Sequence, residues 1–297
     1  MNIEEIEQLF KSKGLQNKWD KFKTFIRNSI VLSETPINES EIKIGQSKIG
    51  GVPDLPDNIP WPVWKNKPLS FLAQINFEET RPYDIEKVLP ARGIAGFFYH
   101  AKQKTSGGDP KDKGSFRVLY HDGPIDQLKR RTSPDILPKS SIFQPCQLSF
   151  KAELSVPNYE CSLIDDFFST DEGDGHDEVD RYCEFLENIY DHINTSSKLL
   201  GHSNTIQGAM EIECEWMSLG YTQEYIEAFD EDDFDENDPQ YLKSKADALR
   251  WRLLLQLDSL DSAKMMWGDT GQLFFWIKDT DLANMNFEDV WMMLQCY

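Results

Sequence analysis

Short apolar segments, each ended by proline or glycine, occur towards both ends of this 297-residue chain and constrain its fold most. The segment 147–154 alternates cleanly, as in an antiparallel strand with one buried face. Further strands are predicted at FLAQINF from Phe71, GIAGFFYH from Gly93, FRVLY from Phe116, and at 252–257, 272–277 and 290–296. Helical patterns precede or separate these groups of strands and do not alternate with single strands. The sequence therefore predicts an α+β fold with largely antiparallel sheets.

Apolar residues recur at helical spacing in four regions. The first covers residues 1–31, where Gly14 separates two helices, and the others are 178–193, 210–229 and a helix near Tyr241. We predict N-terminal helices over 1–40, followed by a single α+β domain over 41–297. The later helices would form a central insertion in that domain.

Two stretches of the chain resemble each other. KIGGVPDLP, FLAQINF and GIAGFFYH are echoed in the same order by KLLGHSNTI, LLLQLDS and GQLFFWIK, with Gln74 and Gln256 in corresponding strands. We interpret them as half-repeats, 41–156 and 195–297, of a pseudo-duplicated fold. Chance similarity of two apolar strands is the alternative, because short strand patterns are ambiguous.

The negative charge is concentrated in one segment. The chain has 51 acidic and 31 basic residues. Between Ala152 and Leu242 lie 25 of the acidic and two of the basic residues, a net charge of −23. The remaining 26 acidic and 29 basic residues nearly cancel. Such a field repels phosphate backbones and attracts cations, so we expect a basic protein partner and no nucleic acid. The candidate partner surface is Asp230, Asp232, Asp233, Asp235 and Glu236. The alternative is that these carboxylates only solvate exposed helices and loops.

Strong catalytic and cofactor motifs are absent from the sequence, which has no phosphate-binding loop, dinucleotide-binding loop, zinc-protease helix or nucleophile elbow. The five cysteines show no CxxC spacing, and the histidines form no metal-binding pair. A calcium loop around Gly175 fails at both anchor positions, Thr170 and Arg181. We therefore expect no metal and no cofactor, assign no catalytic residue, and favour a protein that is not an enzyme.

The cellular compartment is predicted from the same features. The amino terminus lacks a signal-peptide pattern, and no apolar stretch approaches the roughly 18 residues of a membrane span. Irregularly spaced cysteines fit a reducing compartment. We expect a cytoplasmic protein without a membrane partner.

The loops before two strands have an unusual composition. GGVPDLPDNIPWPVW combines proline and glycine with tryptophan, which implies a rigid irregular backbone, and WGDTGQLFFW makes a tight turn into a strand. If the half-repeats face each other, these loops form a ligand cleft. Its candidate residues are Trp61, Trp64, Gln74, Gln256, Asp258, Trp267 and Asp269. The alternative is that tryptophan and proline only cover the ends of the sheet.

A family resemblance is carried by KIGGVPDLPDNIPWP, PLSFLAQINFEE, LPARGIAGFFYH and MMWGDTGQLFFWIKDTDLANMNFEDVWMMLQCY. These stretches resemble the YwqG-like family of bacterial proteins, a domain of unknown function, from about Lys48 to Tyr297. The resemblance implies a bacterial cytoplasmic protein with an α+β, largely antiparallel fold. It implies no site residues, because the family brings no established activity with it.

Three functions are therefore weighed. The first is a protein-interaction module, of the immunity or antitoxin kind, that binds a basic partner through an acidic surface. The second is a small-molecule binder or an enzyme with a cleft formed by the Gly, Pro and Trp loops, which a deep pocket lined by those tryptophans would favour. The third, DNA mimicry, requires carboxylates spaced like phosphates.

Overall fold

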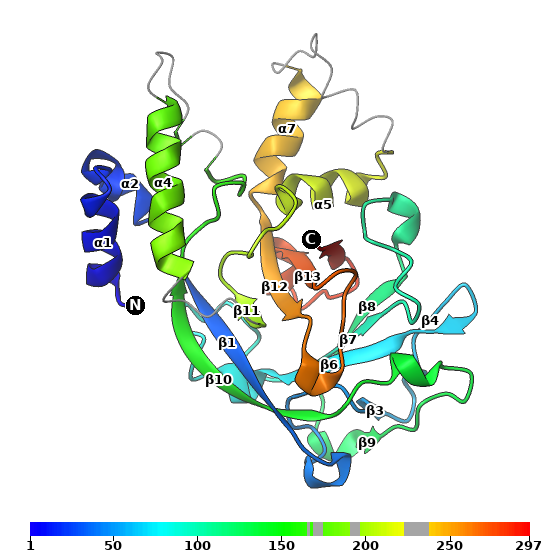
Figure 1. Cartoon of the computed structure of the whole chain (residues 1–297). Coiled ribbons are helices and arrows are strands. Elements are labelled where there is room, and N and C mark those ends of the chain that lie inside the picture. Colours follow the sequence, from blue (N-terminus) through cyan, green and yellow to red (C-terminus); the bar gives the residue numbers. More distant parts are fainter. Residues whose placement is uncertain (165–166, 169–174, 191–196, 223–237) are drawn as a thin grey trace.

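The computed structural model describes residues 1–164, 167–168, 175–190, 197–222 and 238–297 (Figure 1). Its largest element is a ten-stranded sheet in which every strand pair is antiparallel. In spatial order the strands are β14 (Trp291–Gln295), β13 (Gln272–Lys278), β12 (Trp251–Asp258), β11 (Lys198–Leu200), β1 (Arg27–Pro36), β10 (Cys146–Ser155), β2 (Lys48–Ile49), β6 (Ser70–Asn76), β7 (Ile94–Tyr99) and β8 (Phe116–His121). The sheet curves until its edges approach, since the Phe116 and Trp291 ring centroids lie 5.3 Å apart. The predicted α+β, largely antiparallel fold is confirmed.

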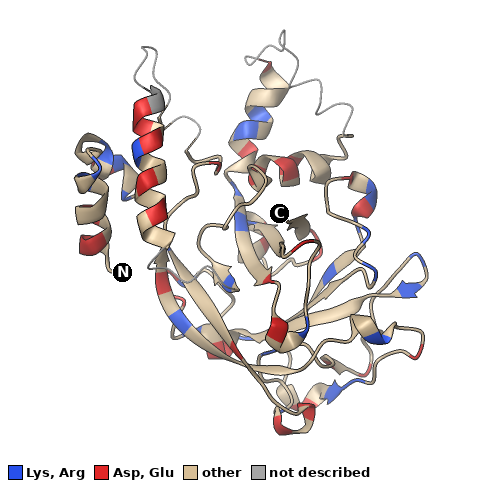
Figure 2. Ribbon diagram, in the orientation of Figure 1, with Lys and Arg blue, Asp and Glu red and all other residues tan. Residues whose placement is uncertain are grey.

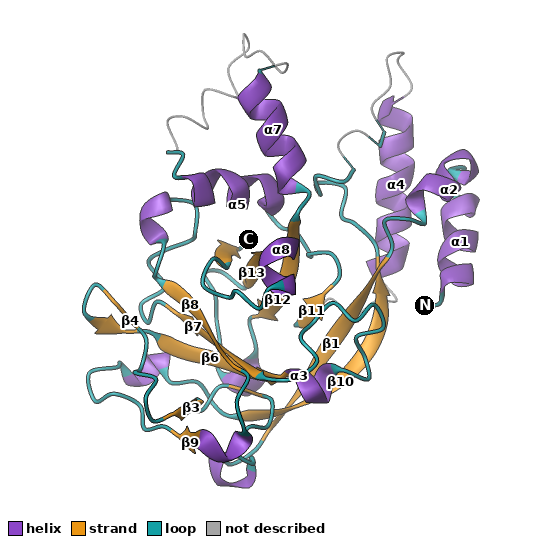
Figure 3. Cartoon of the chain, turned by 180° about the vertical axis from the view of Figure 1, so that it is seen from behind, coloured by secondary structure: helices purple, strands orange, loops and turns teal. Residues whose placement is uncertain are grey.

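Helices lie on both sides of this sheet (Figures 1 and 3). They are α1 (Ile3–Ser12), α2 (Trp19–Phe22), α3 (Phe77–Thr80), α4 (Gly175–Tyr190), α5 (Met210–Leu219), α7 (Pro239–Ala248) and α8 (Asp279–Ala283). Two small ribbons, β3 (Asp54–Pro56) with β9 (Leu128–Arg130) and β4 (Val63–Trp64) with β5 (Lys67–Pro68), lie beside the first half of the sheet. Within the described ranges, no helix has the length and apolarity needed to cross a bilayer.

The N-terminal segment differs from the prediction. The two helices that helical spacing suggested are present as α1, which Asn2 caps in a reciprocal capping box with Glu5, and α2, which ends at Phe22. The predicted helix is wrong beyond that point, because residues 27–36 form β1, which pairs with β10 on one side and β11 on the other. A strand buried on both faces reads as a continuous apolar run, which periodicity does not separate from a helix. Part of the 1–40 segment thus belongs to the main sheet.

The helical region predicted over 210–229 is interrupted, and its residues 223–229 lie outside the described residues. The first helix, α5, ends at Leu219, where Gly220 adopts a left-handed conformation (φ 85°) and its amide donates to the carbonyl of Met217. This is a common way for a helix to stop, because glycine reaches positive φ without steric cost. The helix predicted over 178–193 is confirmed over 178–190 as part of α4, which begins three residues earlier, and residues 191–193 lie outside the described residues.

Two large hydrophobic cores and one smaller cluster hold these elements together. The main core fills the concave side of the sheet and includes Leu255, Phe275 and Trp291. A second core joins α1, α2 and α4, where the rings of Phe10 and Phe22 stack with centroids 4.2 Å apart and both contact Phe185 edge-on. The helix α4 is therefore fixed to the N-terminal helices by buried aromatic rings.

The two halves of the sheet correspond position by position. Lys48 of β2 pairs with Gln74 of β6, and Lys198 of β11 pairs with Gln256 of β12. The two strands that carry these glutamines, β6 and β12, also share a register shift at equivalent positions. It lies between Phe71 and Ala73 in β6 and between Leu253 and Leu255 in β12. After each lysine, two consecutive residues have positive φ: Gly50 and Gly51 in the first half, Leu200 and Gly201 in the second.

Candidate functional site

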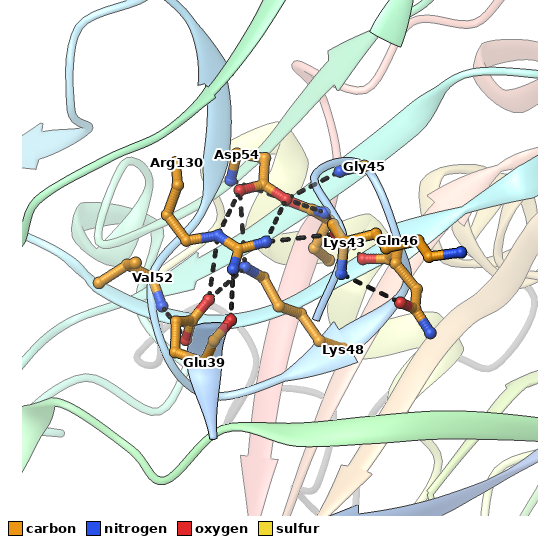
Figure 4. A network of polar contacts seen from close by, with 9 residues as sticks. Glu39, Lys43, Gly45, Gln46, Lys48, Val52, Asp54 and Arg130 are labelled. Atoms are coloured by element: carbon orange, nitrogen blue, oxygen red, sulfur yellow. Dashed lines mark hydrogen bonds and ion pairs between the residues drawn. The ribbon is translucent and has the colours of Figure 1, made fainter. Parts of the chain in front are cut away.

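The predicted site residue Gln74 lies in a buried polar network at the start of the first half (Figure 4). Its Oε1 accepts a hydrogen bond from the amide of Asp54 at 2.9 Å. Its Nε2 donates to the Gln46 carbonyl at 2.9 Å and to the Asp54 carboxylate at 3.0 Å. Gln74 thus anchors the loop before β3 on β6.

Four charged side chains complete this network. Lys48 Nζ lies 2.8 Å from Glu39 Oε1 and 3.7 Å from Asp54 Oδ1. Arg130 Nε lies 2.8 Å from Asp54 Oδ1 and 3.2 Å from Glu39 Oε1. Burial by itself would raise the pKa of Asp54, but the Arg130 hydrogen bond and the Lys48 charge hold that pKa below its ordinary value. Two acids and two bases balance, which makes this a buried structural ion network.

The second half of the sheet has an equivalent lysine, Lys198, but no carboxylate in the place of Asp54. Asn204 stands where the first half has Asp54: its amide donates to Gln256 Oε1 at 3.0 Å, and its Oδ1 accepts from Lys198 Nζ at 2.7 Å. Among the described residues, no carboxylate lies within ion-pair distance of Lys198. Burial lowers the pKa of Lys198 to about 7, and the nearby charge of Glu153 opposes this shift only in part. Lys198 therefore prefers the charged form much less strongly than an exposed lysine does.

A small cavity adjoins this lysine. It measures about 10 Å³ and is lined by Ser29, Ser155, Tyr190 and Lys198, among others. That volume holds one water molecule at most. The lysine is chemically unusual, but the space beside it excludes an organic ligand.

The tryptophans of the predicted cleft lie in separate places. Trp267 is fully buried in the main core, and its Nε1 donates to the Asp258 carbonyl at 3.0 Å. Trp61 and Trp64 pack instead against a different cluster that contains Phe98. Both therefore cover the outer side of the first half of the sheet.

The other predicted cleft residues do not join them. Gln74 and Gln256 are buried at equivalent positions in the two halves, and burial raises the pKa of the Asp258 carboxyl. Asp269 is exposed at a turn, where its carbonyl accepts from the amide of Tyr297. The structure thus pairs each glutamine with its own lysine and does not bring the seven residues into one cleft.

The predicted acidic surface, Asp230, Asp232, Asp233, Asp235 and Glu236, lies outside the described residues. The acidic residues of the helices α4 and α5, coloured red in Figure 2, differ in burial. Those of α5 are largely buried: Glu215 Oε2 accepts from Trp251 Nε1 at 2.8 Å and pairs with Lys278 at 2.7 Å. Burial and the charge of Glu211 raise the pKa of Glu213 to about 7. These carboxylates belong to the scaffold.

Most acidic side chains of α4, by contrast, are exposed, although Glu178 is only partly so. The exposed ones are Asp177, Asp180, Glu184 and Glu187. Asp177 pairs with Arg181 one turn away, and Glu184 pairs with Lys13 of α1 at 3.1 Å. Asp180 and Glu187 have no ion-pair partner in the part of the chain that the structure describes. The helix thus presents uncompensated negative charge on a face held rigid by its buried aromatic side.

Sequence reasoning missed the role of the two lysines and of the residues that face them. The signal was present, because KIGGVPD and KLLGHSN each place a lysine six residues before an aspartate or an asparagine. It was unrecognised because the pairing of each lysine with a glutamine depends on strand register. Among the described residues, no group of three or more His, Cys, Asp or Glu side chains is placed to hold a metal ion.

Comparison with known proteins identifies a family whose function is unknown. No curated protein matches the chain. A family model described as a domain of unknown function (DUF1963) matches residues 47–296, which contain every strand of the ten-stranded sheet except β1. Because this match covers most of the chain, the protein belongs to the DUF1963 family.

Proposed function

We propose that this protein is an interaction module that binds a basic partner protein through the acidic surface of its central segment. The observation that carries the proposal is the solvent-facing side of α4, where Asp180 and Glu187 lack an ion-pair partner among the described residues. Fixed, uncompensated charge speeds association with an oppositely charged surface and selects against partners of like charge. A factor of the immunity or antitoxin kind would use such a surface.

The sequence of the central segment supports the same partner class. Residues 223–237 add eight acidic residues and no basic residue between α5 and α7. The helix α7, which follows this stretch, lies at the same end of the molecule as α4 (Figure 1). On the charge of their sequence, we keep Asp230, Asp232, Asp233, Asp235 and Glu236 as candidates for the proposed surface.

A ligand cleft formed by the Gly, Pro and Trp loops has less support. It would require Trp61 and Trp64 to face Trp267, but these residues pack in separate clusters. The small cavity beside Lys198 does not replace it, because that cavity has room for only one water.

Three further inferences, on location, source and duplication, belong to this proposal. We infer a cytoplasmic location, which the five free cysteines support, and a bacterial source, as the resemblance to the YwqG-like family implies. We also infer that the half-repeats 41–156 and 195–297 arose by duplication. The matching lysine–glutamine pairs and register shifts of the two halves support that inference.

The test is a capture experiment from bacterial lysate at low and at high salt, followed by titration of each purified captured protein. The informative variant is Asp180→Asn with Glu187→Gln, and the matched control is Asp122→Asn with Asp126→Asn, which removes two exposed charges elsewhere. We expect a basic protein that binds the wild type and the control equally, is released by salt, and binds the α4 variant several-fold more weakly. Equal binding by both variants, or no basic partner, contradicts the proposal.

A further inference from the structure

The edge strand β8 is open on one side. It is the last strand of the sheet, and within the described chain its backbone hydrogen-bonds only to β7. The other edge strand differs, because the amide of Leu294 in β14 donates to the Ser106 carbonyl at 2.8 Å. An unpaired edge offers a row of amides and carbonyls to another extended chain.

Two adjoining cavities run along this open edge. The larger, about 340 Å³, lies over Val118–His121, between residues 55–59 and residues 285–288. The smaller, about 90 Å³, lies over Phe116–Val118 and shares Val118, Phe287 and Glu288 with the first. The larger volume lies in the range of ligand-binding pockets, and a six-residue strand is about 20 Å long. The groove therefore has the length and depth for a short extended peptide.

The walls of the larger cavity are mostly apolar. Leu55, Pro56, Ile59 and Leu119 form one side. Met285 stands on the opposite rim, with half of its surface exposed (50%) and a left-handed backbone (φ 56°) that non-glycine residues rarely adopt. A large apolar side chain in this cavity would cover Met285 and complete the apolar contact.

Polar groups in the same groove lack partners. Arg117 is exposed and makes no ion pair or hydrogen bond with any described residue. His121 Nε2 is shielded from solvent and has no hydrogen-bond partner in the described structure. Because side chains alternate along a strand, Arg117, Leu119 and His121 share the outer face of β8. A shielded polar atom without a partner is uncommon in a folded protein and points to a missing one.

We propose that β8 binds an extended segment of a partner protein by strand addition, with an acidic residue beside Arg117 and a large apolar residue two positions away, beside Leu119. The backbone of the segment supplies the hydrogen bonds that β8 lacks on its open side. Opposite charges and apolar pairs on neighbouring strands stabilise such pairing, whereas like charges oppose it, so Arg117 sets the charge of the segment. This site is distinct from the acidic face of α4 and needs a partner of the opposite charge.

Selection from a displayed library of random heptapeptides tests the proposal. The wild-type protein should enrich sequences with Asp or Glu two positions from a large apolar residue. Arg117→Glu should enrich Lys or Arg at that position instead. Met285→Asp places a carboxylate in the cavity at a position whose backbone suits aspartate, and should bind the selected peptide at least tenfold more weakly. Ile136→Asp is the matched control at an exposed apolar residue (72% exposed) that lines neither cavity, and should bind as the wild type does.

Hydrogen exchange then distinguishes strand addition from other contacts. Saturation with the selected peptide should slow exchange of the amides of residues 116–121, while Asp180→Asn with Glu187→Gln should leave peptide binding unchanged. The proposal fails if no sequence is enriched, if Arg117→Glu selects the same sequences, or if the amides of β8 are not slowed. It also fails if light scattering shows a dimer that Met285→Asp dissociates, because the edge would then pair with a second copy of this chain.

Discussion

Substitution by methionine should have opposite effects on stability at the two equivalent lysines, Lys48 and Lys198. Lys48→Met removes a cation that lies between Glu39 and Asp54, whereas Lys198→Met removes a buried amine that faces Asn204. We expect Lys48→Met to destabilise the protein and Lys198→Met to stabilise it at pH 7. The two positions serve as matched controls for each other, because both lysines are buried and pair with a glutamine on the neighbouring strand.

The magnitude for Lys198 follows from its pKa. The ordinary lysine pKa is 10.5, and in the folded protein it is lowered to about 7. At about 1.4 kcal/mol for each pKa unit, folding at pH 7 costs about 4 kcal/mol, because the unfolded chain holds a proton that the folded chain partly releases. Methionine removes this cost and also one hydrogen bond of about 1 kcal/mol, which leaves a net gain of about 3 kcal/mol.

The pH dependence has a defined sign. Between pH 7 and pH 10.5 the unfolded chain binds more protons at Lys198 than the folded chain, so this lysine makes the wild type more stable as the pH rises. The advantage of Lys198→Met should therefore be largest at or below pH 7 and disappear towards pH 10. Lys48→Met should cost about 3 kcal/mol or more at neutral pH, because it breaks a buried ion network on one side only.

Urea unfolding followed by tryptophan fluorescence measures these differences at pH 7, 8.5 and 10. The wild type and both variants are compared at each pH, with equal slopes against urea as the check that the unfolded state is unchanged. If Lys198→Met is as destabilising as Lys48→Met, or if its advantage does not depend on pH, the assignment of Lys198 as a desolvated amine with a lowered pKa is wrong.

Three further predictions concern the scaffold. Because burial and the charge of Glu211 raise the pKa of Glu213 to about 7, its ionisation weakens the fold as the pH rises from 4.5 through 7. At about 1.4 kcal/mol for each pKa unit, Glu213→Gln should add about 3 kcal/mol at pH 8 and nothing at pH 4, as urea unfolding would show. Gly50→Ala places a Cβ 2.2 Å from a backbone carbonyl oxygen at φ +68° and should cost more than about 2 kcal/mol, whereas Gly208→Ala, with no atom within 4 Å, should cost about 1 kcal/mol in thermal unfolding. Phe22→Ala should cost about 3 kcal/mol and loosen α1 and α4 together, seen as faster amide exchange in both helices while β12 and β13 stay protected.

The strands were predictable where alternation or turn residues marked them, as along 147–154 and at the glycine before β7. The strand β1 was not, because its residues Ile30, Val31 and Leu32 are all buried and give no period of two. The end of α5 was missed because the apolar pattern continues past Gly220, and backbone conformation ends the helix there.

The candidate site shows the same limit. Composition identified Trp61 and Trp267 as unusual, but sequence spacing does not say which cluster a tryptophan joins, and these two pack in different ones. Lys48 faces the carboxylates of Glu39 and Asp54, whereas Lys198 faces the amide of Asn204. This difference matters only after strand pairing has buried both amines, so sequence spacing alone does not reveal it.

The central position of β1 also sets the order in which the sheet can be completed on the ribosome. Once residue 155 has been synthesised, β1 can pair with β10, and all the strands of the first half are available. The other edge of β1 has no partner until Lys198–Leu200 follows more than forty residues later. During that interval the nascent chain exposes a strand edge that accepts any extended chain, so a fragment ending after β10 should aggregate unless a chaperone covers β1.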